Sequence, residues 1–225
     1  MALAVRTEEV DLVCFPEGRA KVITEKIDHL SPKPFYEAGK RFFDLILSLI
    51  LLPVLLLPML IIALIIRIDS PGKAIFTQTR LGKDQKPFTI LKFRTMHLNA
   101  EEHGPRWASV DDRRSTKFGR FLRHSHLDEL PQIFNIISGQ MSYVGPRPER
   151  PEFYDIFDTY IDGFRQRTMV RPGLTGLAQI NGGYELLPEE KIVYDLKYIK
   201  ERSFGMDAKC ILRTFVEVFG RKGAR

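Results

Sequence analysis

An uncharged segment from Leu45 to Ile66 constrains the fold of this chain more than any other feature of its sequence. Its 22 residues would form a helix of about 33 Å, at roughly 1.5 Å per residue, which is enough to cross the ~30 Å hydrocarbon core of a bilayer. Helices in the core of soluble proteins rarely stay apolar on every face over such a length. The segment therefore predicts that the protein is attached to a membrane.

Two prolines near the midpoint bear on how the segment enters the membrane. Pro53 and Pro58 each remove a backbone donor and clash with the preceding turn. A helix broken there would have halves of about 12 residues, or roughly 18 Å, which is too short to span. Lys40 and Arg41 precede the segment and Arg67 follows it, so both flanks carry the positive charge expected on the cytoplasmic side. These features favour a re-entrant helix-break-helix over a spanning helix, although membrane helices also tolerate proline.

Composition restricts the partners. The net charge of +6 indicates an anionic partner, such as nucleic acid, lipid head groups or nucleotide phosphates. No aromatic-basic motif typical of nucleic-acid binding is recognisable. Cys14 and Cys210 have no metal-ligand spacing, which argues against a disulfide framework or a zinc site. The first fifteen residues contain charges and no long apolar run, so we expect no cleavable secretory signal.

A pair of adjacent acids follows a strongly basic stretch. Residues 113–127 contain five Arg or Lys, two His and no acid, and Asp128 and Glu129 come next. Such a positive field suits a phosphate-bearing substrate. It is also expected to lower the pKa of both carboxyls and keep them ionised as nucleophile or metal ligand. Taken alone, an acid pair is more often part of a solvated helix face.

Pro131 places this acid pair between two expected helices. Apolar residues recur near helical spacing from residue 115 to 137, and proline is best tolerated in the first turn of a helix. We therefore expect one helix to end near Ser125 and another to start near Asp128. The acids would then lie at a helix entrance, where backbone amides can bind phosphate.

The rest of the chain predicts an α+β fold that is mainly helical. Short strands are expected over residues 74–79 and 87–93, forming a small hairpin, and amphipathic helices over 189–201 and 207–219. The last of these helices could lie on a membrane surface or close the core. Residues 97–112 are expected to form a loop near the membrane surface.

Two further loops hold an arginine beside rigid proline turns. Arg147 lies between Pro146 and Pro148, and Arg171 precedes Pro172. Because proline restricts the backbone, each loop would aim a guanidinium at a phosphate or carboxylate. A plain turn with a surface arginine explains either loop alone. The presence of two such loops in one chain favours anion binding.

Six ordered motifs resemble those of the bacterial monotopic phosphoglycosyl transferases, which start exopolysaccharide and glycan assembly. The resemblance covers roughly residues 38 to 220. It is carried by Lys40-Arg41, Gln78-Thr79-Arg80-Leu81-Gly82, Lys92-Phe93-Arg94-Thr95-Met96, Leu127-Asp128-Glu129-Leu130, Gly145-Pro146-Arg147-Pro148 and Arg171-Pro172-Gly173-Leu174-Thr175-Gly176.

The resemblance implies transfer of a sugar-1-phosphate from a UDP-sugar to polyprenyl (undecaprenyl) phosphate, with release of UMP. Asp128 would be the nucleophile that forms a phosphosugar-enzyme intermediate, and Glu129, together with Asp128, would hold Mg²⁺. The implied substrate-binding residues are Arg123, Arg147, Arg171, Lys92, Arg94 and Gln179. The implied membrane-segment residues are Lys40, Arg41, Pro53 and Pro58.

The resemblance also implies a monotopic organisation at the cytoplasmic face of the bacterial inner membrane. Residues 1–37 would form an extension without an assigned function, 38–68 the re-entrant helix and 69–225 the catalytic domain on the membrane surface. The lipid bilayer is then a partner, nucleic acid is not, and a homodimer is compatible with the resemblance.

The chain departs from the family pattern at two positions. Leu57 stands where some members have serine, and Gly183 where many have arginine, so no ligand contact is carried over at residue 183. A non-catalytic membrane scaffold is the competing interpretation.

Overall fold

The computed structural model describes residues 21–102, 112–183 and 186–219. Its α-helices are α1 Pro34–Asp69, α2 Lys117–His124, α3 Gln132–Ile137, α4 Pro151–Asp158, α5 Pro188–Glu201 and α6 Phe204–Phe219. Its 3-10 helices are η2 Lys83–Gln85, η3 Leu127–Glu129, η4 Phe164–Met169 and η5 Gln179–Asn181. Its strands are β1 Val22–Ile23, β2 Ile75–Leu81, β3 Pro87–Phe93, β4 Ser142–Val144, β5 Ile161–Asp162 and β6 Gly173–Thr175. The predicted α+β, mainly helical class is confirmed.

The strands form three separate two-stranded sheets in the described part of the chain. β2 and β3 make the predicted antiparallel hairpin, with Ile75 opposite Phe93. β4 pairs in parallel with β6, and β1 pairs in parallel with β5. Both parallel pairs therefore join segments that are distant in sequence. The predicted helices over 189–201 and 207–219 correspond to α5 and α6.

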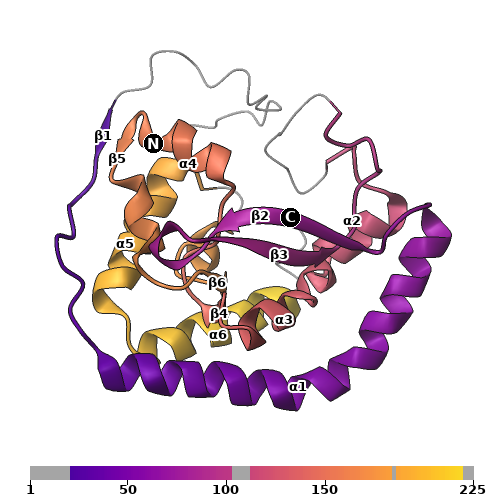
Figure 1. Cartoon of the computed structure of the whole chain (residues 1–225), viewed down its shortest axis with the longest axis horizontal. Helices are drawn as coiled ribbons and strands as arrows, with labels where there is room; N and C mark the ends of the chain where they lie inside the picture. The colour runs from indigo at the N-terminus through magenta and orange to yellow at the C-terminus, as the bar shows by residue number, and fades with distance from the viewer. Residues whose placement is uncertain (1–20, 103–111, 184–185, 220–225) are drawn as a thin grey trace.

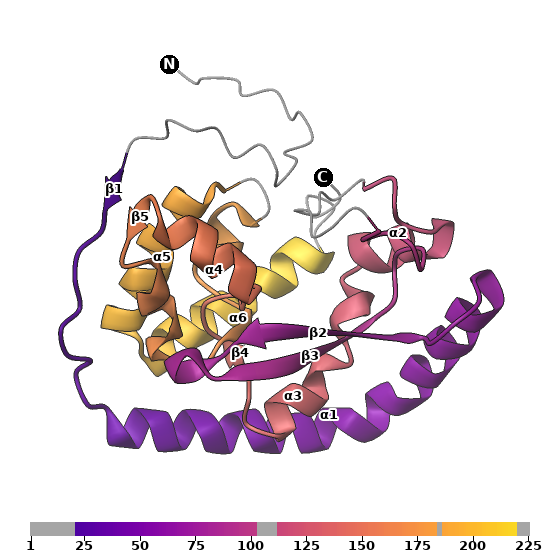
Figure 2. The ribbon, with the colours of Figure 1, turned by 45° about the horizontal axis from the view of Figure 1, so that its top comes forward.

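α1 is one helix of 36 residues that contains both prolines. It runs along one side of the other elements and then bends upward around them (Figures 1 and 2). Pro53 and Pro58 lie inside it, and a proline removes one hydrogen bond while leaving the flanking turns helical, so a bend is its ordinary effect. The expected break between two helices is therefore a bend within one helix.

The inner face of α1 is polar in its first part and apolar in its last part. Tyr36, Lys40, Asp44 and Ser48 recur every four residues and are buried. Farther along, the helix packs Met59, Ile62 and Ile66 against a cluster that includes Phe93 and Leu122. Both ends of α1 therefore contact the same body of protein.

The outer face of α1 carries large apolar side chains exposed along its whole length. A contiguous apolar surface of this kind marks a contact with a partner or a membrane rather than with water. The exposed residues are Phe35, Phe42, Phe43, Ile46, Leu49, Ile50, Val54, Leu56, Leu57, Leu60, Ile61, Leu64, Ile65 and Ile68.

Two other clusters form the interior and position the site. The larger one joins α4, α5, α6 and η4 around Phe157, Phe164 and Ile199, all at most 1% exposed. The smaller one packs Phe88 and Ile90 of β3 against Ile136 of α3. α3 is therefore seated directly on the hairpin.

Candidate active site

The acid pair lies in the short turn η3 between α2 and α3. α2 ends at His124 with Ser125 as its C-cap, which confirms the predicted end, and His126 follows in the left-handed region with φ 56°. The next helix begins at Gln132 rather than near Asp128, because Pro131 serves as its N-cap residue and has no N–H to donate within a helix. The two acids therefore precede the helix entrance instead of forming it.

Both acids are buried, so the solvated-surface interpretation is wrong. Asp128 is 9% exposed and Glu129 8% exposed. Glu129 Oε1 accepts a hydrogen bond from Lys92 Nζ at 2.8 Å and another from Arg147 Nη2, and its Oε2 accepts one from Arg147 Nη1 at 3.3 Å. Burial alone would raise the pKa of Glu129, but the charges of Arg147 and Lys92 outweigh it and hold the pKa below its ordinary value. Glu129 is thus fixed as a carboxylate.

Asp128 behaves differently from its neighbour. Burial raises the pKa of its carboxyl to about 6, against the pull of Lys92, and the charge of Glu129 adds to the rise. The expectation that the basic surroundings lower both pKa values is therefore wrong for Asp128, because desolvation exceeds the attraction of the cations. Among the described residues no side chain donates a hydrogen bond to Asp128, so its oxygens remain available to attack an electrophile.

Lys92 reaches the acids because α3 is fastened to β3. The side chain of Asn135 in α3 bridges to the strand: its Oδ1 accepts from Leu91 N at 3.0 Å, and its Nδ2 donates to Thr89 O at 2.8 Å. Lys92 is the next residue of β3 after Leu91. The hydrophobic spacing of this region predicts two helices and a hairpin, but the amide bridge that brings them together has no signal in the sequence.

The parallel pairing of β4 and β6 brings the two arginine loops side by side. Gly145 N donates to Thr175 O at 2.9 Å, and Gly173 N donates to Pro146 O at 3.0 Å. A Cβ at Gly145 would lie 2.4 Å from Arg171 O, so the approach requires glycine. The two predicted anion loops therefore form one structure, and Arg147 extends from it to Glu129.

Three other expected substrate-binding residues lie around this structure with different partners. Arg123, in the last turn of α2, acts electrostatically on Asp128 and opposes the rise of its pKa. Gln179 uses its Nε2 to donate to Leu174 O at 2.7 Å, which braces the second loop. Arg171 is partly exposed and contributes its backbone to the packing against Gly145. Their substrate contacts stay predictions.

Arg94, although it follows Lys92 closely, faces the end of α1. Its Nη1 donates to Pro71 O at 2.6 Å, and its Nη2 donates to Ser70 O at 2.7 Å and Ser70 Oγ at 2.9 Å. These bonds satisfy acceptors where the helix ends. The structure therefore gives Arg94 a role in holding α1, and contact with substrate remains a prediction.

The two basic residues expected to flank the membrane segment are turned toward the protein. Lys40 Nζ donates to Asp207 Oδ2 at 2.8 Å. Arg41 donates to Ile136 O at 2.6 Å and Ile137 O at 2.8 Å, at the carboxyl end of α3. A buried carboxylate and unpaired helix carbonyls are good partners for these cations. Lys40 and Arg41 therefore anchor α1 to the domain.

The binding of Mg²⁺ by Asp128 and Glu129 stays a prediction. No group of three or more His, Cys, Asp or Glu that could hold a metal occurs among the described residues. Mg²⁺ is commonly held by only one or two carboxylates, with phosphate oxygens and waters completing the shell. Adjacent Asp128 and Glu129 supply such a donor set, and Asp128 is the more open of the two because Lys92 and Arg147 occupy Glu129.

Buried ion pairs behind the site were missed by the sequence analysis. Arg167 of η4 pairs with Asp195 of α5 at 2.6 Å, and Arg80 pairs with Glu149 at 3.4 Å. The partners are far apart in sequence, and helix periodicity places Asp195 on α5 without indicating what it faces. Only the tertiary structure identifies them.

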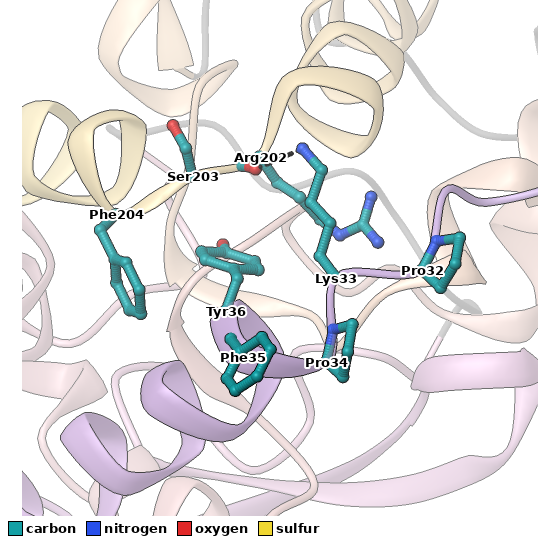
Figure 3. Close-up of a pocket in the computed structure, with 8 residues that line it drawn as sticks. All are labelled: Pro32, Lys33, Pro34, Phe35, Tyr36, Arg202, Ser203 and Phe204. Atoms are coloured by element: carbon teal, nitrogen blue, oxygen red, sulfur yellow. Dashed lines mark hydrogen bonds between the residues drawn. The ribbon is translucent and has the colours of Figure 1, made fainter.

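A separate groove lies at the start of α1 and does not include the acid pair (Figure 3). Its volume is about 390 Å³, and Phe35, Tyr36 and Phe204 contribute aromatic walls. Its polar groups are already bonded: Lys33 Nζ donates to Arg202 O at 2.8 Å, and Arg202 Nε donates to Glu37 Oε1 at 2.9 Å. The chemistry of the site therefore rests on the acid pair and not on this groove.

Comparison with known proteins identifies a family and several relatives. Residues 35–221 match a family described as bacterial sugar transferase. The chain is 39% identical over 211 residues to the UDP-N-acetylgalactosamine-undecaprenyl-phosphate N-acetylgalactosaminephosphotransferase of Aeromonas hydrophila, covering 89% of this chain and 50% of that protein. It is 39% identical over 214 residues to the UDP-glucose:undecaprenyl-phosphate glucose-1-phosphate transferase of Xanthomonas campestris pv. campestris, covering 92% of this chain and 44% of that protein.

A third relative is covered more fully. The chain is 41% identical over 188 residues to the UDP-glucose:undecaprenyl-phosphate glucose-1-phosphate transferase of Caulobacter vibrioides, covering 81% of this chain and 70% of that protein. The chain spans about half the length of the first two relatives.

Proposed function

Because the chain belongs to the bacterial sugar transferase family, we propose that it transfers a sugar-1-phosphate group from a UDP-sugar to a polyprenyl phosphate and releases UMP. The observation that carries this proposal is the division of the acid pair: two cations hold Glu129, whereas the buried Asp128 has free oxygens. The printed names of the relatives, which combine a UDP-sugar with undecaprenyl phosphate, support the substrate classes.

In the first step a carboxylate oxygen of Asp128 attacks the β-phosphorus of the UDP-sugar. The new bond joins this oxygen to phosphorus, and the bond from the β-phosphorus to the bridging oxygen breaks with its electron pair leaving on UMP. The product is an acyl phosphate, the mixed anhydride of the Asp128 carboxyl group and the sugar phosphate. A carboxylate nucleophile divides one difficult displacement into two.

In the second step an oxygen of the polyprenyl phosphate attacks the same phosphorus. The bond to Asp128 breaks and returns the carboxylate, while the sugar becomes joined to the lipid through a diphosphate. Phosphoryl transfer depends mainly on positioning and on neutralising charge. Lys92 and Arg147 supply positive charge beside the acids, and Arg123 supplies more from α2.

Mg²⁺, held by Asp128 and Glu129, would supply further charge neutralisation on the diphosphate oxygens. The residues present fit this role because an adjacent acid pair leaves most of the coordination shell to phosphate and water. The protein's own contribution is to keep Glu129 ionised and in place.

α1 is proposed to enter the membrane and return to the same face. A straight helix of 36 residues would be about 54 Å long and would separate its ends across a bilayer. However, Lys40 of α1 contacts Asp207, and the C-cap residue Ser70 accepts hydrogen bonds from Arg94, so both ends adjoin one domain. The bend and the apolar outer face support the re-entrant arrangement. The proposal further places the protein at the cytoplasmic face of the inner membrane, where it would catalyse a first membrane step of surface-glycan synthesis.

The decisive experiment measures UMP release from a panel of UDP-sugars with polyprenyl phosphate and Mg²⁺. Asp128→Asn is expected to abolish turnover and to prevent the phosphosugar from remaining on the denatured protein, because an amide cannot form the acyl phosphate. Asp155→Asn is the matched control, since Asp155 is an exposed aspartate in α4. Normal turnover in Asp128→Asn would overturn the nucleophile assignment, and membrane binding without UMP release from any donor would favour a scaffold.

A further inference from the structure

The Pro146–Pro148 segment, which carries Arg147, has all three of its carbonyl groups held by other parts of the protein. They accept, in order, hydrogen bonds from Gly173 N at 3.0 Å, Arg167 Nη2 at 3.0 Å and Arg80 Nη1 at 3.3 Å. Two of the three residues are prolines, which have no N–H to donate. The segment is therefore fixed from outside, through its acceptors.

Two of these bonds set the direction of the Arg147 side chain. A peptide unit is planar, so holding its carbonyl orients the whole plane. The plane before the Arg147 Cα carries the carbonyl bound by Gly173, and the plane after it carries the carbonyl bound by Arg167. With both planes held, the Cα–Cβ bond has one direction. The guanidinium then meets Glu129 with two hydrogen bonds.

Arg167 is itself held in the interior of the protein. Its Nε donates to Asp195 Oδ2 at 2.6 Å, and both side chains are 1% exposed. Its guanidinium carbon lies 4.8 Å from the centroid of the Phe164 ring. Burying an ion pair is often no more stabilising than packing apolar residues of similar volume. Stability alone therefore does not account for this pair, whereas the bond to Arg147 does.

We propose that Arg167 is a positioning residue: held by Asp195, it orients Arg147 and thereby keeps Glu129 in place beside Asp128. The inference rests on the proposed function, because the reacting atom is an oxygen of Asp128. Arg167 contacts neither Asp128 nor Glu129. Its effect on the position of Glu129 therefore passes through the backbone of Arg147. This connection predicts that the effect of Arg167 depends on the presence of the Arg147 side chain.

The test is a double-mutant cycle on UMP release. Arg167→Met/Asp195→Leu removes both charges together and leaves no unpaired charge in the core. We expect kcat to fall about 10²-fold, the scale of a small misplacement at a reacting centre. In an Arg147→Ala background the same two substitutions are expected to cause little further loss, because the side chain that they position is absent. Equal losses in both backgrounds, or no loss in the wild-type background, would overturn the proposal.

Two more variants guard against unfolding and non-specific effects. Arg167→Lys keeps a charge opposite Asp195 but lacks the planar fork that reaches two partners, so the same dependence on Arg147 is expected with a smaller loss. Arg165→Gln is the matched control, because Arg165 lies in the same helix η4 and pairs with the exposed Asp155 and Asp158. Its activity is expected to stay at the wild-type level.

A measurement that does not depend on enzymatic activity tests the positioning role of Arg167 separately from the proposed function. Hydrogen exchange of the Gly173 amide, which donates to Pro146 O, is expected to become at least about tenfold faster in Arg167→Met/Asp195→Leu and to be unchanged in Arg165→Gln. Unchanged exchange in the double variant would overturn the positioning role. If the wild-type protein releases no UMP from any donor, the proposed function fails while the exchange comparison still decides the role of Arg167.

Discussion

At the acid pair, two equally buried carboxyls have pKa values shifted in opposite directions, because only Glu129 accepts hydrogen bonds from cations among the described residues. Glu129 is surrounded by donors from Lys92 and Arg147, which more than offset its desolvation. Asp128 loses water without gaining a hydrogen-bond donor from a described side chain. An anion that is desolvated but not hydrogen-bonded is a better nucleophile than one held by two cations, so the geometry separates the roles of adjacent residues.

The pKa of Asp128 gives a prediction with a definite sign. Since its raised pKa is about 6, the carboxylate is expected to be protonated as the pH falls through about 6. A titration of ¹³C-carboxyl-labelled aspartate, assigned by comparison with Asp128→Asn, measures this midpoint in the metal-free protein. Lys92→Met should move the midpoint upward because Lys92 favours the ionised form, and Mg²⁺ should move it downward. A midpoint near 4 would contradict the assigned burial.

At the scale of elements, α1 combines three kinds of surface in one helix. A buried polar stripe, which includes Lys40 and Asp44, attaches its first part, and an apolar stripe attaches its last part. The outer face is apolar throughout. Between the two attached parts, the prolines bend the axis so that both stripes can reach the same domain.

Arg94 is predicted to act on the attachment of α1 rather than on substrate. Because its guanidinium bonds Ser70 and Pro71, Arg94→Met should lower the free energy of unfolding by about 1–3 kcal/mol with little change in the KM for the UDP-sugar. Lys92→Met, in contrast, should reduce kcat at least tenfold and lower the free energy of unfolding less than Arg94→Met does. Denaturant unfolding in detergent and steady-state UMP release distinguish the two variants. A raised KM with normal stability in Arg94→Met would restore its predicted substrate contact.

At the scale of the whole molecule, the described N-terminal residues form a strap outside the family match, which starts at residue 35. β1 pairs with β5, and Figure 2 shows this segment running down one side of the molecule to α1. Ile27 N donates to Gln166 Oε1 at 2.6 Å, and Lys33 bonds the end of α5. The strap therefore ties the start of α1 to η4, the helix that carries Arg167.

The proposed re-entrant arrangement of α1 makes a topological prediction. In a background with Cys14→Ser and Cys210→Ala, single cysteines at Pro32 and Lys73 should both react with an impermeant maleimide in inverted membrane vesicles and remain unlabelled in intact spheroplasts. Both positions are exposed and lie beyond the two ends of α1. Val54→Cys, within the exposed apolar stretch, should be protected in both preparations. Labelling of positions 32 and 73 from opposite faces would establish a spanning helix.

The sequence alone determined the features that depend on local pattern. The uncharged run from Leu45 to Ile66, the short strands of the hairpin and the helical spacing of the last two helices are properties of neighbouring residues. The end of α2 near Ser125 follows in the same way from Pro131. The motifs also indicated the family and the acids, because their residue types and order are written in the chain.

The tertiary structure decided the properties that depend on residues distant in sequence. Burial, with the charge of Glu129, raises the pKa of Asp128 above the value expected in a basic field, and the docking of α3 on β3 brings Lys92 to Glu129. The same holds for Arg167, which reaches the site through the backbone of Arg147. Desolvation and hydrogen-bond geometry depend on contacts between residues that are distant in sequence. They can therefore not be predicted from local sequence patterns.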